Sequence, residues 1–164
     1  MSQAMSDPFV QPREPTPAAA MAAIAEEFRF FDDWMDRYGM VIDWGRSLPP
    51  FPPAWQDDKH RVEGCQSQVW LAADHREGRL FLAAASDAAI VAGLVAMLLR
   101  IYSGRTPEEV LAADAGAFLK ELDLIGNLSA NRGNGIASMV ARIRAVAAAA
   151  AAGVTAQAAS VPAG

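Results

Sequence analysis

The chain has 164 residues, of which 52% are hydrophobic and 20% are charged, so it is long and apolar enough to fold around one core. Its formal net charge of −5 argues against general nucleic-acid binding, which needs a dense basic face to neutralise phosphates. A single cysteine, Cys65, cannot form an internal disulfide, so nothing in the sequence requires an oxidising compartment.

The two ends of the chain differ in composition from its middle. Residues 1–16 lack hydrophobic periodicity and predict a flexible N-terminal arm, and residues 151–164 predict an Ala-rich flexible tail. Residues 17–150 are then expected to form one folded domain. The N-terminus lacks the charged start and apolar run of a secretory signal, and the apolar stretches are too short or too broken to span a bilayer. We therefore expect a cytoplasmic protein that binds no membrane.

Two helices are expected first. Thr16 and Pro17 are the residue types of a helix cap and of a first helical position, and an apolar stripe follows them. The stripe has i, i+3, i+4, i+7 spacing and consists of Met21, Ile24, Ala25 and Phe28. Asp32 is placed to cap a second helix that continues to about Gly45. The proline-rich segment SLPPFPPAWQDD then excludes regular structure and predicts a stiff loop.

A β-hairpin is expected after this loop. Residues 67–74 alternate like a strand, the sequence HREG supplies a turn, and residues 79–85 form the returning strand. The residues expected on one face of the first strand are Val69, Leu71 and Ala73. The residues before Cys65 are a candidate third strand.

Helices dominate the second half of the chain. Ser86 or Asp87 is expected to cap an apolar helix that ends near Tyr102. The tetrapeptide TPEE at 106–109 has the pattern of a capping box, and a further helix is expected over 114–122. The sequence GNLSANRGNG predicts a loop before a long last helix. Together these elements predict an α+β domain, in which a small antiparallel sheet of about three strands is packed by several helices.

Cys65 lies at a junction between a loop and a strand. Cysteine is among the most buried residue types, so a packing role is the ordinary interpretation of a single cysteine. Here the cysteine follows Gly64 and precedes a polar run, whereas a core cysteine usually lies within an apolar run. Catalytic and carrier residues are often placed on loops at such junctions, so the local sequence favours a working thiol.

The stretch around Cys65 resembles the signature of the SufE family of sulfur acceptors, Gly-Cys-x-Ser-x-Val-Trp. The matching residues are Gly64, Cys65, Ser67, Val69 and Trp70. Residues 86–98 resemble the family's buried helix and its entry, and residues 128–135 resemble the arginine loop before its final helix, with Arg132 in place. The resemblance covers about residues 20–150, and the proline-rich loop and the Ala-rich tail depart from it.

The resemblance implies a SufE/NifU-like fold and a role as a sulfur carrier. A pyridoxal-phosphate-dependent cysteine desulfurase, of the SufS or CsdA kind, would hold sulfur as a persulfide. Cys65 would take the outer sulfur by a displacement like thiol–disulfide exchange. The carrier would stimulate the desulfurase and pass sulfur to an iron–sulfur assembly scaffold or another recipient, with no cofactor of its own and little activity alone. One thiol suits this role, because a second would resolve the persulfide as a disulfide.

The resemblance also nominates residues around Cys65. Arg132 would support the thiolate or the partner, since nearby positive charge favours a thiolate. Asp87 would contact the partner or orient the cysteine loop, with a plain helix cap as the alternative. The residues expected to contact the partner, together with Arg132, are Glu63, Gly64, Gln66, Ser67, Gln68 and Asp87.

Two other classes of function stay open. A single-cysteine redox sensor or peroxidase would convert Cys65 rapidly to sulfenic acid with peroxide. A pure interaction module would leave a buried thiol that alkylating reagents reach slowly. A metal site is disfavoured because His60, Cys65 and the nearby aspartates make a poor ligand set. A Cys–His hydrolase with His60 as base lacks a recognisable third residue.

Overall fold

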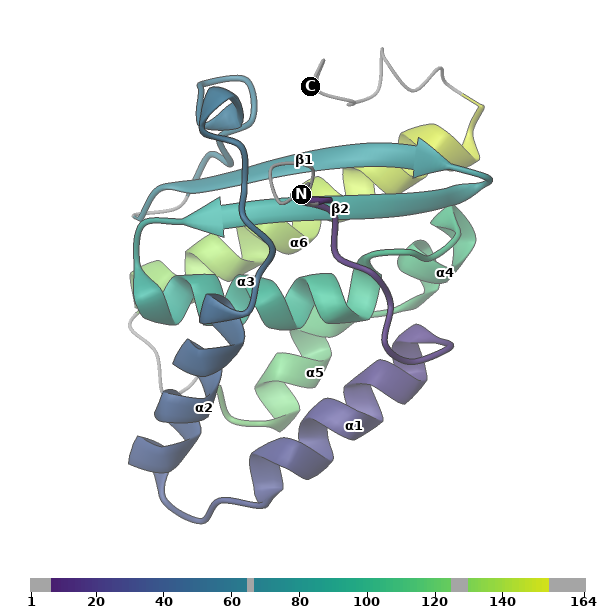
Figure 1. Cartoon of the computed structure of the whole chain (residues 1–164). Helices are drawn as coiled ribbons and strands as arrows, with labels where there is room; N and C mark the ends of the chain where they lie inside the picture. Colours follow the sequence, from purple (N-terminus) through teal and green to yellow (C-terminus); the bar gives the residue numbers. More distant parts are fainter. Residues whose placement is uncertain (1–6, 65–66, 125–129, 154–164) are drawn as a thin grey trace, which may run out of the picture.

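The structure is a computed structural model that describes residues 7–64, 67–124 and 130–153, with the backbone alone for 130–134. In chain order its helices and strands are α1 (Pro17–Arg29), α2 (Trp34–Arg46), β1 (Val69–Arg76), β2 (Arg79–Ser86), α3 (Ala89–Tyr102), α4 (Pro107–Ala112), α5 (Ala115–Glu121) and α6 (Ala130–Ala151). They form layers: the β1–β2 hairpin lies over α3 and α6, and α1, α2 and α5 lie on the far side of α3 (Figure 1). The predicted α+β class is confirmed.

The hairpin is antiparallel and pairs residue for residue from Val69 with Ser86 to Arg76 with Arg79. Because successive side chains of a strand point to opposite faces, alternate residues of each strand face the helices. The inner residues of both strands belong to the main core: Val69, Leu71, Ala73, Leu80, Leu82 and Ala84. The alternation predicted for the first strand is therefore confirmed.

The sheet has two strands in the described residues, where about three were predicted. The segment before Cys65 contributes only an isolated bridge between Arg61 and Trp70. Two backbone hydrogen bonds support that bridge, from Val62 N to Val69 O and from Leu71 N to His60 O, each 2.8 Å long. Pairing cannot continue along the chain because Gly64 already has a positive φ of 88°.

The outer face of the hairpin is covered by loop segments. Ala72 and Ala83 pack there with Phe9, and the rings of Phe51 and Trp55 lie against this cluster. The predicted stiff loop thus supplies two aromatic side chains to a second, smaller apolar cluster, and its only regular structure is a 3₁₀ turn at Pro53–Trp55.

The described part of the expected N-terminal arm, residues 7–16, is packed against the domain. Val10 N donates to Leu82 O over 2.8 Å, and the Ser103 hydroxyl donates to Val10 O over 2.7 Å. Phe9 is 7% exposed. These contacts are distant in the sequence, so composition alone did not indicate them.

Local signals located most helix starts. Thr16 caps α1, and Thr106 forms a capping box with Glu109 at α4. The cap of α2 is Asp33, whose side chain accepts from Met35 N, and not the predicted Asp32. Neither Ser86 nor Asp87 caps α3, because the N-cap position is Ala88.

The last helix begins earlier than expected. The backbone of 130–135 is already helical, although its Asn and Gly residues predicted a loop. Each glycine costs a helix only about 1 kcal/mol, which the continuation of a 22-residue helix outweighs. No helix among the described segments has the length and hydropathy of a membrane span.

Candidate functional site

The candidate site is the segment that connects the Arg61 bridge to β1, and it holds the only cysteine of the chain. Cys65 and Gln66 themselves lie outside the described residues. The residues on either side of them are described, so the geometry of the two ends of this segment is known.

The entry to the segment is fixed against the sheet and against α6. The backbone pairs of His60 with Leu71 and of Val62 with Val69 attach it to β1. At Gly64 a Cβ would collide with the hydroxyl of Ser138 on α6. The positive φ at position 64 favours glycine, and a Cβ there would also require the Ser138 hydroxyl to rotate away.

The exit is fixed by Asp87. Its carboxylate accepts a hydrogen bond from Gln68 N over 3.0 Å, and its own N–H donates to Gln68 O over 3.2 Å. Asp87 follows β2, so this reciprocal pair joins the start of one strand to the residue after the other. The side chain of Asp87 thus orients the exit of the cysteine segment, and it does not cap α3.

Helix α6 braces the entry from the other side. The guanidinium of Arg142 donates to Arg61 O and to Lys59 O, both at a long 3.4 Å. Arg142 lies one turn after Ser138, so both face the segment. Sequence reasoning did not assign either residue to the site, and the only signal was the position of Arg142 off the apolar stripe of the last helix.

His60 is buried at the base of the entry. It is 3% exposed, its ring stacks on Trp55 with centroids 5.9 Å apart, and its Nδ1 lies 2.6 Å from a carboxylate oxygen of Asp57. The hydrogen bond from His60 holds the pKa of Asp57 below its usual value. Nε2 of His60 has no hydrogen-bond partner within the described residues. The arrangement supports a role for His60 in anchoring the entry.

The described residues hold no cluster of three or more His, Asp or Glu side chains that could bind a metal ion. Cys65 lies outside that search, so its own surroundings are not covered by it.

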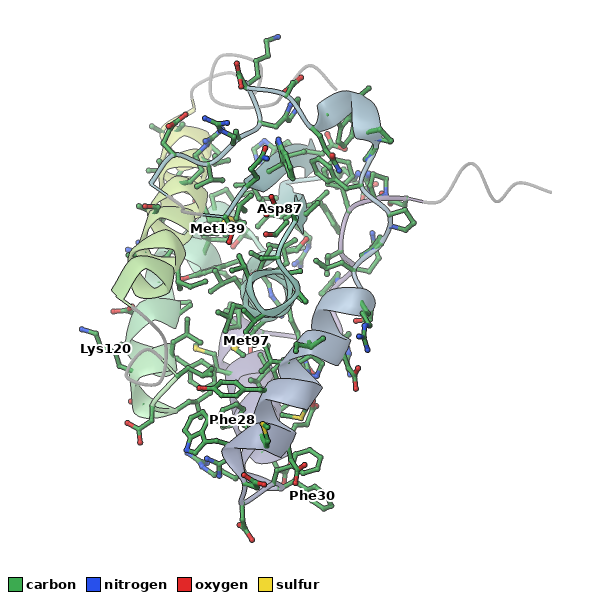
Figure 2. The ribbon with its side chains drawn as sticks, turned by 90° about the vertical axis from the view of Figure 1, so that its left-hand side faces the viewer. Phe28, Phe30, Asp87, Met97, Lys120 and Met139 are labelled. Carbon is green, nitrogen blue, oxygen red and sulfur yellow. The ribbon has the colours of Figure 1, made fainter. Side chains whose placement is uncertain are left out.

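The other predicted site residues lie around the same end of the molecule. Glu63, Gly64, Gln68 and Asp87 are exposed, and Ser67 is half-buried. Arg132 lies in the first turn of α6 and not in a loop, and its side chain is outside the described residues. The start of β1, the end of β2 and the starts of α3 and α6 gather at the left of Figure 1, and this end faces the viewer in Figure 2, where Asp87 is labelled.

Comparison with known proteins gives one family. The sequence model of SufE, described as an Fe-S metabolism associated domain, matches residues 22–147. An uncharacterized SufE-like protein from Rhizobium etli is 42% identical over 130 residues, which are 77% of this chain and 88% of that protein. A second, from Rhizobium meliloti, is 41% identical over 125 residues, which are 74% and 89% of the two chains.

A solved structure shares the fold. The solution structure of a hypothetical protein from Thermus thermophilus superposes with a TM-score of 0.68 at 22% sequence identity, and the match covers 81% of this chain and 96% of that one. At this identity the match supports the architecture alone.

Proposed function

The chain belongs to the SufE family, which is associated with Fe–S metabolism, and from this premise we propose that it is a sulfur acceptor for a cysteine desulfurase. In this proposal Cys65 takes persulfide sulfur from a desulfurase of the SufS or CsdA kind. The chain then delivers the sulfur to an iron–sulfur scaffold or another recipient, and it stimulates the desulfurase by clearing its persulfide. It acts as a carrier in the cytoplasm and has little activity alone.

The observation that supports this proposal best is the fixation of both ends of the cysteine segment. At one end Val62 N donates to Val69 O and Gly64 lies close to Ser138 of α6, and at the other end Gln68 N donates to Asp87. Only three residues separate Gly64 from Gln68, and Cys65 is one of them. A carrier needs its acceptor atom at a defined place that a partner can reach.

The proposed transfer is a displacement at sulfur. The Cys65 thiol first loses its proton to the solvent or to a base of the partner, since the thiolate is the nucleophile. The thiolate attacks the outer sulfur of the desulfurase persulfide, so that a new S–S bond forms on Cys65 as the S–S bond of the desulfurase breaks. The desulfurase cysteine leaves as a thiolate. There is no net oxidation, and the pyridoxal phosphate belongs to the partner.

The proposed docking surface surrounds this segment. Its exposed described members are Glu63, Gly64, Gln68 and Asp87, with Ser67 half-buried beside them. We assign Gln66 to the same surface because it follows Cys65 directly in the sequence, and Arg132 from the family resemblance. Three carboxylate or amide side chains among the exposed residues suit a partner that presents hydrogen-bond donors.

Mass spectrometry tests the proposal directly. The purified chain is incubated with a cysteine desulfurase and cysteine, and the peptide that contains Cys65 is weighed. We expect a gain of one sulfur atom that a reductant reverses, and an increase in the turnover of the desulfurase. The Cys65→Ser variant should keep the fold and the docking, measured by circular dichroism and by affinity for the desulfurase, but lose both effects.

Two results would contradict the proposal. One is the absence of added sulfur with several active desulfurases, and rapid sulfenic acid formation with peroxide would then support a redox sensor. The other is full stimulation of the desulfurase by Cys65→Ser, because stimulation would then not depend on the thiol.

A further inference from the structure

Two large hydrophobic side chains are strongly exposed where α1 and α2 meet. Phe30 is 80% exposed and Met35 is 72% exposed. Figure 2 shows Phe30 projecting at the lower end of the molecule, well below Asp87. The rings of Phe30 and Phe31 contact each other edge to face with centroids 5.2 Å apart. Large exposed apolar side chains that are grouped in this way mark interaction sites more often than isolated ones do.

A groove lies beside Phe30, between the two helices. It has a volume of about 460 Å³ and is open to solvent. Its lining residues are Glu26, Glu27, Phe30, Phe31, Met40 and Trp44. We call these six residues the α1–α2 groove. Its volume accommodates the large apolar side chains by which a peptide helix is anchored in a groove.

The fold uses only part of the groove's apolar surface. Helix α1 packs into the core through Ile24 and Phe28, and Val41 is the only fully buried residue of α2. Met40 and Trp44 are half-buried: each packs against the main core with part of its side chain and lines the groove with the rest. The apolar surface of the groove is available for an interaction without any rearrangement of the core.

The charge of the groove selects the partner. Glu26 and Glu27 are its only charged lining residues. Glu27 forms an ion pair with Arg100, whereas Glu26 is exposed and has no ion pair or side-chain hydrogen bond among the described residues. Residues 22–46 carry six acidic and three basic side chains, so the surroundings are also acidic. A partner that places positive charge beside apolar side chains is complementary to this surface.

We propose that the α1–α2 groove binds a basic amphipathic helix of a partner protein. The apolar face of that helix would place one or two large side chains between Phe30, Met40 and Trp44. A Lys or Arg one turn away would pair with Glu26. Such a helix lying in an apolar groove is a recurring mode of peptide recognition. The surface lies apart from Asp87 and the cysteine segment, so it is a second interaction site (Figure 2).

The proposal is tested with a model helix and the full chain. The probe is a peptide of about 18 residues made of Leu and Lys with helical periodicity, and its control is a scrambled peptide of the same composition without an apolar face. Binding is followed by NMR chemical shifts of the ¹⁵N-labelled chain. We expect the largest shifts at groove residues with the amphipathic peptide, and a dissociation constant that rises about tenfold in Phe30→Ser.

Charge reversal provides the matched control. Glu26→Lys should weaken binding of the amphipathic peptide several-fold, whereas Glu121→Lys makes the same charge change at an exposed site on α5 and should leave the affinity unchanged. The proposal would be overturned if Glu26→Lys and Glu121→Lys weakened peptide binding equally, or if the scrambled peptide bound as tightly as the amphipathic one. Either result would mean that binding reflects only the net charges of the peptide and the chain. Sedimentation that shows self-association lost in Phe30→Ser would instead assign the groove to a second copy of the chain.

This inference is independent of the sulfur-acceptor proposal. The Phe30→Ser variant should accept sulfur on Cys65 as the wild type does, because Phe30 belongs to neither end of the cysteine segment. Loss of peptide binding with intact sulfur transfer separates the two surfaces. If Phe30→Ser lost sulfur acceptance while still folded, the groove would belong to the desulfurase interface, and the claim of a second site would be wrong.

Discussion

At the scale of one residue, Asp87 has a different role from the helix cap that its neighbouring residues predict, because its side chain bonds a residue that is distant in the sequence. An aspartate before an apolar helix predicts a helix cap. In the structure its carboxylate accepts instead from Gln68 N, which lies 19 residues earlier in the chain. The partner is brought near by the pairing of β1 with β2, which places Val69 opposite Ser86. Asp87 therefore restrains the exit of the cysteine segment.

Removal of this restraint should change the reactivity of the thiol. In Asp87→Ala, Gln68 N loses its acceptor, and we expect Cys65 to react several-fold faster with a maleimide and the free energy of unfolding to fall by about 0.5–1.5 kcal/mol. Asp87→Asn retains an acceptor oxygen and should stay close to the wild type. Asp74→Ala, which removes the pair with Arg76 near the other end of the hairpin, is the control and should not change the alkylation rate. Equal rates in Asp87→Ala and the wild type would contradict the restraint.

At the scale of elements, the contact between α2 and α3 depends on two glycines. A Cβ on Gly93 of α3 would collide with the carbonyl of Val41, and a Cβ on Gly45 of α2 would lie 2.7 Å from Gly93 N. The helices therefore approach more closely than side chains would allow. This contact positions α2, and with it one wall of the α1–α2 groove.

Two glycine substitutions should have effects of opposite sign. Gly93→Ala raises helix propensity but forces α2 away from α3, so we expect a loss of about 2 kcal/mol or more in the free energy of unfolding. Gly39→Ala, in α2 with open space around its Cβ position, should gain up to about 1 kcal/mol. Urea unfolding of both variants checks this. A stabilised Gly93→Ala would show that α2 and α3 can separate at little cost.

The sequence predicted most of the features that depend on neighbouring residues and missed those that depend on contacts between distant segments. The caps at Thr16 and Thr106 are formed by atoms within three residues, so their patterns located α1 and α4 correctly. The segment before Cys65 forms one bridge to β1 and no third strand, an outcome that depends on pairing between separate segments of the chain. The early start of α6 was missed because its Asn and Gly residues locally favour a loop. The motif around Cys65 located the candidate site, but Ser138 and Arg142 lie more than 70 residues away, so nothing in the sequence near Cys65 indicates that they contact this segment.

At the scale of the whole molecule, the N-terminal segment joins the hairpin to the helical layer. Glu14 pairs with Arg100 over 2.6 Å, and its carbonyl accepts from Arg105 over 2.6 Å. Asp7 pairs with Arg76 of β1 over 2.9 Å. The hydrogen bonds from these arginines hold the pKa of Glu14 and that of Asp7 below their usual values. The N-terminal segment is thus linked to the middle of the chain by carboxylate charges that acid would remove.

The ion pair of Glu14 should make stability depend on pH in a defined direction. Because its folded pKa is lowered, its contribution is complete above the unfolded pKa of about 4.3 and is lost as the pH falls through the folded value. At pH 7 we expect the free energy of unfolding of Glu14→Gln to be about 1–2 kcal/mol lower than that of the wild type. This difference should shrink below about pH 4. Urea unfolding at a series of pH values measures both curves. Glu108→Gln, at an exposed site on α4, is the control, and its curve of unfolding free energy against pH should run parallel to that of the wild type. A Glu14→Gln curve that also ran parallel would mean that Glu14 does not link the N-terminal segment to α3.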